Sequence, residues 1–248
     1  MIISAVTCKI FGKTTIEIRD ISELFTVYGD VFRKTFNLTD NTFNRKYKFK
    51  KDRGGFLVVI KDKQNVLGLF TLSFALDNFL ELGDVVKLDS TFPRETYATA
   101  MGRACNLVVK QNKQQGIYGY PNPYAINLEK MAGFKENSLY VRSVSLVFLN
   151  FIFLLPIQIY GGKIHNYRNF YKRKVIRHNV KLLPTRLTKF NLRIFKKAHK
   201  ENAKDGNIKI GFLYEFVPSE GFGDPFLVFG DKEFDVSKIG FEFCDNSV

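Results

Sequence analysis

The chain has 248 residues, of which 45% are hydrophobic, so it is long and apolar enough to bury a full core. Its formal net charge of +14 points to an anionic partner. Cys8, Cys105 and Cys244 are widely separated, which excludes a disulfide framework and predicts no metal site. The first residues lack a basic region and a long apolar run, so we expect no signal peptide and a cytoplasmic protein.

The first half of the chain alternates helical and extended patterns. A helix is predicted over residues 21–36, and a hairpin of two strands follows at 55–60 and 66–75. The next predicted elements are a strand at 84–88 and a long helix from about 94 to 113.

Residues 116–134 predict a short strand, at 117–120, and then a capped helix. Asn122 can accept a hydrogen bond from a free N–H of the first helical turn, and the fixed φ of Pro123 suits the first helical position. Gly133 is placed to end the helix. Small and apolar residues recur at helical spacing on the side that we expect to pack inward: Ala125, Leu128 and Ala132.

This order of elements, over roughly residues 15 to 145, resembles the GNAT superfamily of acyl-coenzyme-A-dependent N-acyltransferases. The closing helix of that superfamily often reads Asn-x-x-Ala and later Gly-Phe, a spacing that Asn122, Ala125, Gly133 and Phe134 match. The Gly-Tyr-Pro-Asn run at 119–122 looks most like the branch found in polysaccharide-biosynthesis clusters. The resemblance implies an α+β fold with a mixed, mostly antiparallel sheet flanked by helices.

The resemblance also implies acetyl-CoA or another acyl-CoA as co-substrate and an amine as acceptor. The superfamily's phosphate loop, Arg/Gln-x-x-Gly-x-Gly/Ala, lets backbone N–H groups at a helix N-terminus approach the phosphates. The corresponding stretch, 93–100, has no glycine in either register, although its small residues leave the helix terminus open. The residues expected to contact the cofactor are Thr96, Tyr97, Ala98, Thr99, Asn122 and Tyr124.

The candidate catalytic residues are all carboxylic acids. Many family members place a tyrosine seven residues beyond the asparagine, where it protonates the departing thiolate, and this chain has Glu129 there. A glutamic acid can do the same only if burial raises its pKa. Asp84 and Asp89 flank the strand that faces the acyl group in GNAT folds, and Glu81 precedes it. For each acid the ordinary alternative is a solvent-facing position, and Glu129 could equally pair with a neighbouring lysine.

Residues 144–160 form an apolar stretch that is interrupted by Asn150, Pro156 and Gln158. It is shorter than the roughly 20 residues that a membrane helix needs. We therefore expect buried strands, or the edge of a partner surface, rather than a membrane span.

Charge is concentrated in residues 163–200, which hold 13 Lys and Arg and no acid. Leu187, Phe190 and Ile194 repeat at helical spacing, which predicts an amphipathic helix lying on an anionic membrane surface or docked on the protein. Nucleic acid is the least favoured anionic partner, because no recognised nucleic-acid motif is present. A lysine-rich but ordinary solvated surface is the alternative.

The C-terminal stretch predicts strands at 208–217, 225–229 and 239–244. The expected domains are a GNAT-like acyltransferase domain over 1–162, a basic, partly helical connecting segment over 163–207, and a β-rich extension over 208–248.

The sequence thus favours a cytoplasmic acyl-CoA-dependent N-acyltransferase, with peripheral contact at the inner face of a membrane. A phosphate-linked amino sugar in surface polysaccharide biosynthesis fits both the branch and the basic segment, by analogy. The alternative is a non-catalytic GNAT-like module that binds an anionic membrane surface or nucleic acid through its basic segment.

Overall fold

The computed structural model divides the chain into two compact units. It describes residues 2–8, 14–63, 65–122, 124–148, 151–160, 163–166, 210–219, 221–234 and 241–244. The first unit combines Met1–Asn137 with Pro225–Phe234, and the second combines Ser138–Asp224 with Asp235–Val248. The domain boundaries expected at 162 and 207 stay a prediction. In the described part of the chain no helix is both long and apolar enough to cross a membrane.

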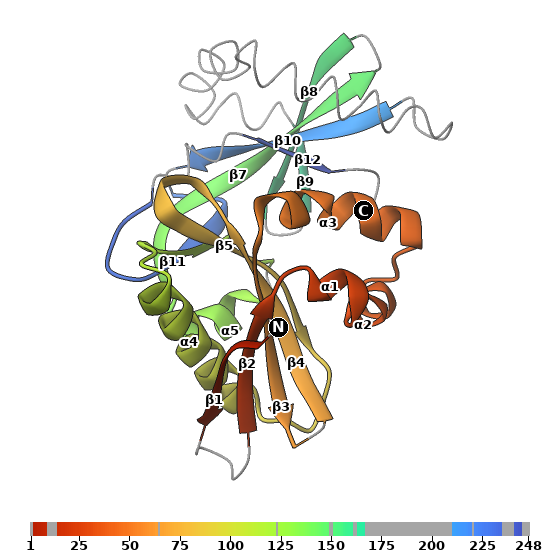
Figure 1. Ribbon diagram of the computed structural model, residues 1–248. Helices are drawn as coiled ribbons and strands as arrows, with labels where there is room; N and C mark the ends of the chain where they lie inside the picture. The colour runs from red at the N-terminus through yellow and green to blue at the C-terminus, as the bar shows by residue number, and fades with distance from the viewer. Residues whose placement is uncertain are drawn as a thin grey trace. The chain divides into compact units, whose positions relative to one another are not determined.

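The first unit is built on a sheet in the order β1-β2-β3-β4-β5-β6-β11 (Figure 1). All neighbouring strands in it are antiparallel except β5 and β6, which are parallel. The fold class is therefore confirmed as α+β with a mixed, mostly antiparallel sheet. The strands are β1 (Ile2–Cys8), β2 (Thr14–Asp20), β3 (Gly55–Asp62), β4 (Asn65–Phe74), β5 (Phe79–Lys87), β6 (Gly116–Gly119) and β11 (Asp224–Phe229).

Helices cover both faces of this sheet (Figure 1). They are α1 (Glu23–Thr26), α2 (Gly29–Thr35), α3 (Asp40–Arg53), α4 (Arg94–Gln111) and α5 (Ile126–Met131). Side chains that alternate along the strands form two cores. Val58 and Leu72 pack on the face of α4, whereas Leu57 and Leu69 pack on the face of α1–α3. We call these the α4 face and the α3 face.

The long helix α4 follows from its own pattern of residues. Tyr97, Met101, Ala104 and Val108 recur at helical spacing and are fully buried, so one side of the helix packs on the sheet. On another side, a Cβ added at Gly102 would lie 2.3 Å from the carbonyl oxygen of Ala132. Gly102 thus lets the end of α5 lie directly against α4.

The predicted elements are largely present, with two exceptions on the α3 face. The hairpin, α4 and β6 lie where the sequence places them, but the helix predicted over 21–36 is split into α1 and α2. Helix α3 was not predicted, because its apolar contact with the core depends on two buried aromatic residues, Phe43 and Tyr47. Asp40 in its first turn and basic residues in its last complement the helix dipole.

Strands β4 and β5 are paired out of step at one position. Leu69 pairs with Val86 and Thr71 with Gly83, so β5 carries one residue more than β4 in this interval. Asp84 lies in the extra length with φ of +49°, a conformation that a non-glycine residue adopts at a bulge. We call this segment, 83–86, the β5 bulge.

Strand β11 completes the first unit although it lies far along the chain. Leu227, Val228 and Phe229 pair with β6, at Gly119, Tyr118 and Ile117. The side-chain amide of Asn137 holds the residue that ends this segment: it donates to the Phe234 carbonyl at 2.8 Å and accepts from its N–H at 3.3 Å.

The second unit consists of antiparallel strands. They are most of β7 (Lys135–Phe148), with β8 (Phe151–Tyr160), β9 (Lys163–Asn166), β10 (Ile210–Ser219) and β12 (Phe241–Cys244). β7 pairs with β8 and β10, β8 with β9, and β10 with β12. The strands predicted within 144–160, 208–217 and 239–244 are thus present. The amphipathic helix predicted around residues 187–194 lies outside the described residues.

Candidate active site

The parallel strands β5 and β6 stay paired over a short distance and then part. They pair at Phe79–Gly116, Leu80–Ile117 and Glu81–Tyr118. Beyond Tyr118, Gly119 pairs with Leu227 of β11, while β5 continues along β4 into the bulge. Within the described residues, β5 from Leu82 onward has no β6 partner. We call this point, beyond Glu81 and Tyr118, the fork.

Glu129 lies on the α4 face of the fork. An added Cβ on Gly119 would be 3.0 Å from its Oε2 and 3.6 Å from the Leu82 side chain, which places the carboxyl group over the end of β6. Glu129 is 3% exposed, and Oε2 has no hydrogen-bond partner among the described groups. Burial raises the pKa of Glu129 to about 8.

The backbone around Glu129 holds it in place. Asn122 Oδ1 accepts hydrogen bonds from the N–H groups of Tyr124 and Ala125, each at 3.0 Å, in the turn before the helix. The prediction that Asn122 caps the helix itself is wrong, because the cap position is Ala125 and no side chain caps it. The helix α5 itself begins at Ile126, and the Glu129 N–H donates to the Ala125 carbonyl at 2.9 Å. Gly133, with φ of +101°, follows the end of the helix. The alternative of an exposed Glu129 paired with a lysine is wrong, because Glu129 is buried, and its neighbour Lys130 pairs with Glu136 instead.

The neighbouring thiol also senses the Glu129 carboxyl. Burial raises the pKa of Cys105 on α4, and Glu129 raises it further. Cys105 is therefore a protonated core residue without nucleophilic character.

Glu81 lies on the opposite, α3 face of the fork. Its Oε2 is 2.9 Å from Nη1 of Arg53, the last residue of α3, and its Oε1 accepts a hydrogen bond from the Tyr120 hydroxyl at 3.0 Å. Ser73 of β4 is paired directly with Glu81 and so shares its face. The Ser73 Oγ is buried and, in the described part of the protein, has no hydrogen-bond partner.

Asp84 lies in the β5 bulge and points to the α3 face. Its Oδ2 is 2.8 Å from Lys50 Nζ, which also donates to Thr71 Oγ1 at 3.2 Å. Thr71 in turn donates to the Gly83 carbonyl at 2.8 Å, and a Cβ on Gly83 would lie 2.1 Å from Lys50 Nζ. This network ties the bulge to α3, so the Asp84 carboxylate is already committed to a cation.

Tyr97 holds the bulge from the α4 face. Its hydroxyl donates to the Val86 carbonyl at 3.1 Å. Its ring packs directly on Gly68, where an added Cβ would lie only 2.3 Å from the ring atom Cε2. Tyr97 is fully buried, and this burial raises the pKa of its hydroxyl. Its side chain is therefore part of the core, and any contact with a cofactor would have to be made by its backbone.

The other residues expected at the cofactor differ in accessibility. Ala98 and Thr96 are buried, and the Thr99 hydroxyl donates to the Glu95 carbonyl at 2.9 Å. No side chain caps the N-terminus of α4, so its first N–H groups have no partner within the helix. Tyr124 is 90% exposed, and Arg94 donates to its carbonyl at 3.1 Å, which joins the start of α4 to the loop after β6.

Asp89 lies in the turn that leads into α4, away from the fork. Its Oδ1 accepts hydrogen bonds from the Thr91 hydroxyl and N–H at 2.6 and 2.8 Å, and these bonds lower the pKa of Asp89. This arrangement is that of a turn-forming aspartate. No group of His, Cys, Asp and Glu that could hold a metal occurs among the residues described.

Glu81 is a weak candidate from the sequence alone, and the sequence does not point to Arg53 or Tyr120. The strand predicted from the sequence begins at residue 84, which leaves Glu81 before it, whereas β5 begins at Phe79. The signal for an earlier start is the alternation of Leu80 and Leu82 on either side of Glu81, which is typical of a strand. Arg53 belongs to the helix that was not predicted.

The chain matches no family model and no curated protein sequence. Among solved structures it is similar to a spermidine N-acetyltransferase from Vibrio cholerae in complex with CoA and spermine, at 18% identity over 50% of this chain and 83% of that chain, with a TM-score of 0.37. An IAA acetyltransferase from Bacillus cereus shows 14% identity over 55% and 83%, with a TM-score of 0.39. A conserved protein from Enterococcus faecalis, described as a probable N-acyltransferase, shows 13% identity over 55% and 36%, with a TM-score of 0.40. These similarities are too weak to support an argument about activity.

Proposed function

We propose that the protein is an acyl-CoA-dependent N-acyltransferase whose reaction takes place at the fork. The observation that carries the proposal is Glu129: a buried carboxyl group, with an unpartnered oxygen and a pKa raised to about 8, beside the point where two parallel strands part. A group that keeps its proton at neutral pH can donate it to a leaving group. The order of elements implied by the GNAT resemblance supports the same reading.

In this proposal each side of the fork has its own role. β5 beyond Glu81 presents backbone N–H groups that can stabilise the oxyanion formed when an amine attacks the acyl carbon. Glu129, on the α4 face, gives its proton to the thiolate sulfur as the C–S bond breaks, and regains a proton from solvent. The amine approaches from the α3 face and loses its proton to a carboxylate or to water. Atoms and charge balance: one amide and one thiol form.

The cofactor's phosphates would lie at the start of α4. The free N–H groups of its first turn and Arg94 favour a phosphate there, whereas Glu95 opposes it. Among the expected residues, those that are not buried are Thr99, Asn122 and Tyr124.

The acceptor is an amine, and its finer identity stays a prediction. A phosphate-linked amino sugar, a role in surface polysaccharide biosynthesis and contact with an anionic membrane all depend on residues 163–207. That segment lies almost entirely outside the described residues.

A binding and turnover experiment tests the proposal. Titration of acetyl-CoA and longer acyl-CoA compounds into the free protein, followed by calorimetry, should show saturable binding; a ligand at a hundred times its Kd should also add about 2.7 kcal/mol of stability. Release of CoA thiol in the presence of a panel of primary amines then measures turnover. Glu129→Gln should lower turnover by roughly 10² while binding is kept.

The matched control is Glu136→Gln, which removes an exposed carboxylate near the same helix. It should leave both binding and turnover unchanged. The absence of binding by every acyl-CoA tested would refute the proposal, and full turnover by Glu129→Gln would remove Glu129 from it.

A further inference from the structure

The α3 face of the fork carries a cluster of polar side chains in which the arginine Arg53 is the cationic partner of the carboxylate Glu81. The cluster consists of Glu81, Arg53, Tyr120 and Ser73, defined by the contacts given above. Tyr118, which pairs with Glu81, stacks on Tyr120 with ring centroids 6.4 Å apart. A carboxylate bordered by aromatic rings is the chemistry that binds an organic cation.

Glu81 requires a positive charge at this position. Its side chain is 6% exposed, and a carboxylate so far from water is stable only when a cation and hydrogen bonds compensate its charge. Glu81 cannot move away, because it lies on a central strand paired on both sides, with Ser73 and with Tyr118.

Arg53 is placed differently. It is the last residue of α3, and 35% of its side chain is exposed. Burial by itself lowers the pKa of Arg53, but the Glu81 carboxylate outweighs this and raises it, with smaller contributions from Tyr118 and Tyr120. Because 35% of its side chain is already exposed, the guanidinium group can withdraw into water, provided that another cation takes its place beside Glu81.

The buried hydroxyl of Ser73 points to such a second cation. A hydroxyl group that is buried without a partner is unfavourable, and native structures rarely keep one. Because Ser73 lies directly opposite Glu81, a group carrying several N–H donors on one nitrogen could bond to Glu81 and to Ser73 together. The single Nη1 contact of Arg53 with Glu81 leaves Ser73 unbonded.

We infer that Arg53 occupies the site of the acceptor's ammonium group, so that a primary ammonium ion and Arg53 compete for Glu81. The inference rests on the proposed function for its meaning, but the site itself does not involve acyl-CoA. It names the acceptor class as compounds with a protonated primary amine, held by Glu81 and Ser73 and bordered by Tyr118 and Tyr120. Because Arg53 competes for Glu81, it weakens the affinity of the site for an amine.

Titration of n-butylammonium chloride, followed by calorimetry or NMR, tests the competition. Arg53→Gln should bind this ion at least tenfold more tightly than the wild type, because Glu81 no longer has its internal partner. Lys34→Gln removes one positive charge from an exposed position on α2 and should behave as the wild type. The affinity for tetramethylammonium, which has the charge but no N–H donor, should increase much less in Arg53→Gln.

The variants Arg53→Gln with Glu81→Gln, and Arg53→Gln with Ser73→Ala, locate the site. The first should abolish the gain and the second should reduce it. A gain that persists without Glu81, or no gain in Arg53→Gln, overturns the inference.

A measurement on the wild type covers the case in which Arg53→Gln does not fold. The Nε–Hε NMR signal of Arg53, assigned from its loss in Arg53→Lys, should move as n-butylammonium is added. A signal that stays still up to saturating ion overturns the inference. Binding of n-butylammonium without any binding of acyl-CoA would refute the proposed function and leave the ammonium site standing.

Discussion

Two carboxyl groups flank the fork, and they are kept in a nearly dry environment by different means. Glu81 on the α3 face has an ionic partner and a hydroxyl donor, whereas Glu129 on the α4 face has an oxygen with no partner in the described residues. The contrast shows that burial alone does not set the chemistry of an acid. A partner compensates the charge on one side, and a retained proton removes the charge on the other.

The difference follows from what the two faces are made of. The α3 face receives basic residues from the last turn of α3, namely Lys50 and Arg53, which reach the sheet at Asp84 and Glu81. The α4 face is lined by apolar residues and by Gly119 and Gly102, which bring backbone and helix close without supplying a charge. An acid on that face has to remain neutral to be buried.

The largest expected effect is on stability after Glu129→Gln. The pKa of Glu129 is raised in the folded state, from 4.5 to about 8, so the folded protein holds a proton that the unfolded chain has lost. Wild-type stability should therefore fall as pH rises from about 5 to 8, by on the order of 3 to 5 kcal/mol, and Glu129→Gln should not show this loss. Denaturant unfolding at several pH values measures the difference. Parallel curves for the two proteins would mean that Glu129 is ionised in the fold.

Glu81→Gln should act in the opposite direction. It leaves Arg53 beside a neutral amide, and we expect a loss of about 1 to 2 kcal/mol, moderated because the guanidinium can return to water. Glu136→Gln, which breaks an ion pair exposed by nearly half on both sides, should change stability by less than about 0.5 kcal/mol. If Glu81→Gln is as neutral as this control, the Glu81–Arg53 pair does not compensate a buried charge.

Gly119→Ala sharpens the comparison by crowding Glu129 alone. The new Cβ would lie 3.0 Å from Glu129 Oε2, while its contact with Leu82 is ordinary at 3.6 Å. We expect a loss of about 1 kcal/mol and a fall in turnover. In a Glu129→Ala background the same substitution should cost nothing, and a double-mutant cycle measures this coupling. Equal cost in both backgrounds would place the clash elsewhere.

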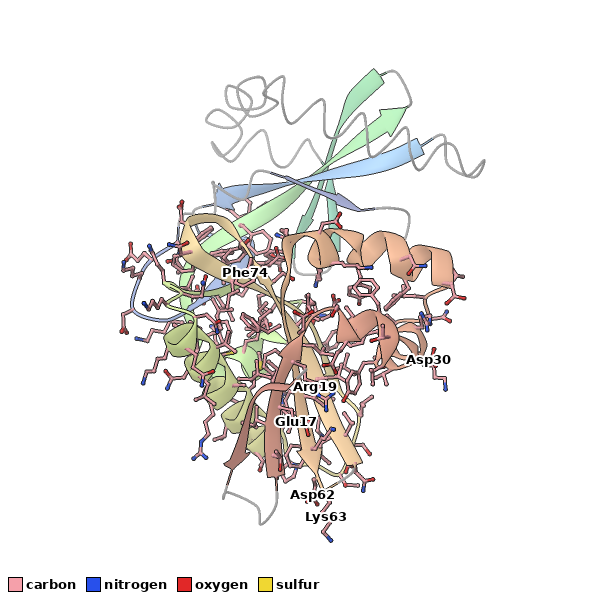
Figure 2. The ribbon with its side chains drawn as sticks, viewed as in Figure 1. Glu17, Arg19, Asp30, Asp62, Lys63 and Phe74 are labelled. Atoms are coloured by element: carbon pink, nitrogen blue, oxygen red, sulfur yellow. The ribbon has the colours of Figure 1, made fainter. Side chains whose placement is uncertain are left out.

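The smallest expected effect is on stability at acidic pH, and it concerns Glu17, a carboxylate that is paired with two basic side chains. Glu17 lies beside Arg19 on β2 (Figure 2), at 2.6 Å, and 3.0 Å from Lys61. Burial raises the pKa of Glu17, but its bonds to Lys61 and Arg19 outweigh this and lower it. A lowered pKa gives stability that is present above about pH 4.5 and lost as pH falls further. Glu17→Gln should reduce this acid sensitivity, by about 1 kcal/mol; an unchanged acid limb of the unfolding curve would contradict it.

The parts of the fold that could be predicted are those with strong local signals. The hairpin and α4 each carry their own apolar pattern, and the structure has them. Asn122 does bond to the backbone that follows it, but it holds the turn before α5 and does not cap the helix. The predicted strand is shorter than β5 because the acids Glu81 and Asp84 interrupt the apolar pattern of the sequence. In the structure both acids lie in the strand, where each is paired with a basic side chain of α3. That helix escaped prediction because its stability depends on tertiary contacts.

The position of Glu129 at the candidate site could be predicted from the sequence, but its burial and protonation could not. The spacing from Asn122 led to Glu129, yet whether that acid is buried depends on Gly119 and Leu82, which no local pattern ties to it. Local patterns likewise cannot predict the pairing of β11 with β6, since it joins the middle of the chain to a strand near its C-terminal end. The sequence predicts Asp84 and Asp89 as candidate catalytic acids beside this strand. In the structure Asp84 is paired with Lys50, and Asp89 stabilises a turn.

The most direct test of the account is the ¹³C NMR titration of the Glu129 carboxyl group, assigned by its absence in Glu129→Gln and recorded with and without CoA. We predict a midpoint near pH 8 in the free protein and a shifted signal when CoA is bound, because the thiol would lie beside this carboxyl group. A midpoint near 4.5, or a signal that CoA leaves unmoved at saturation, would contradict the account.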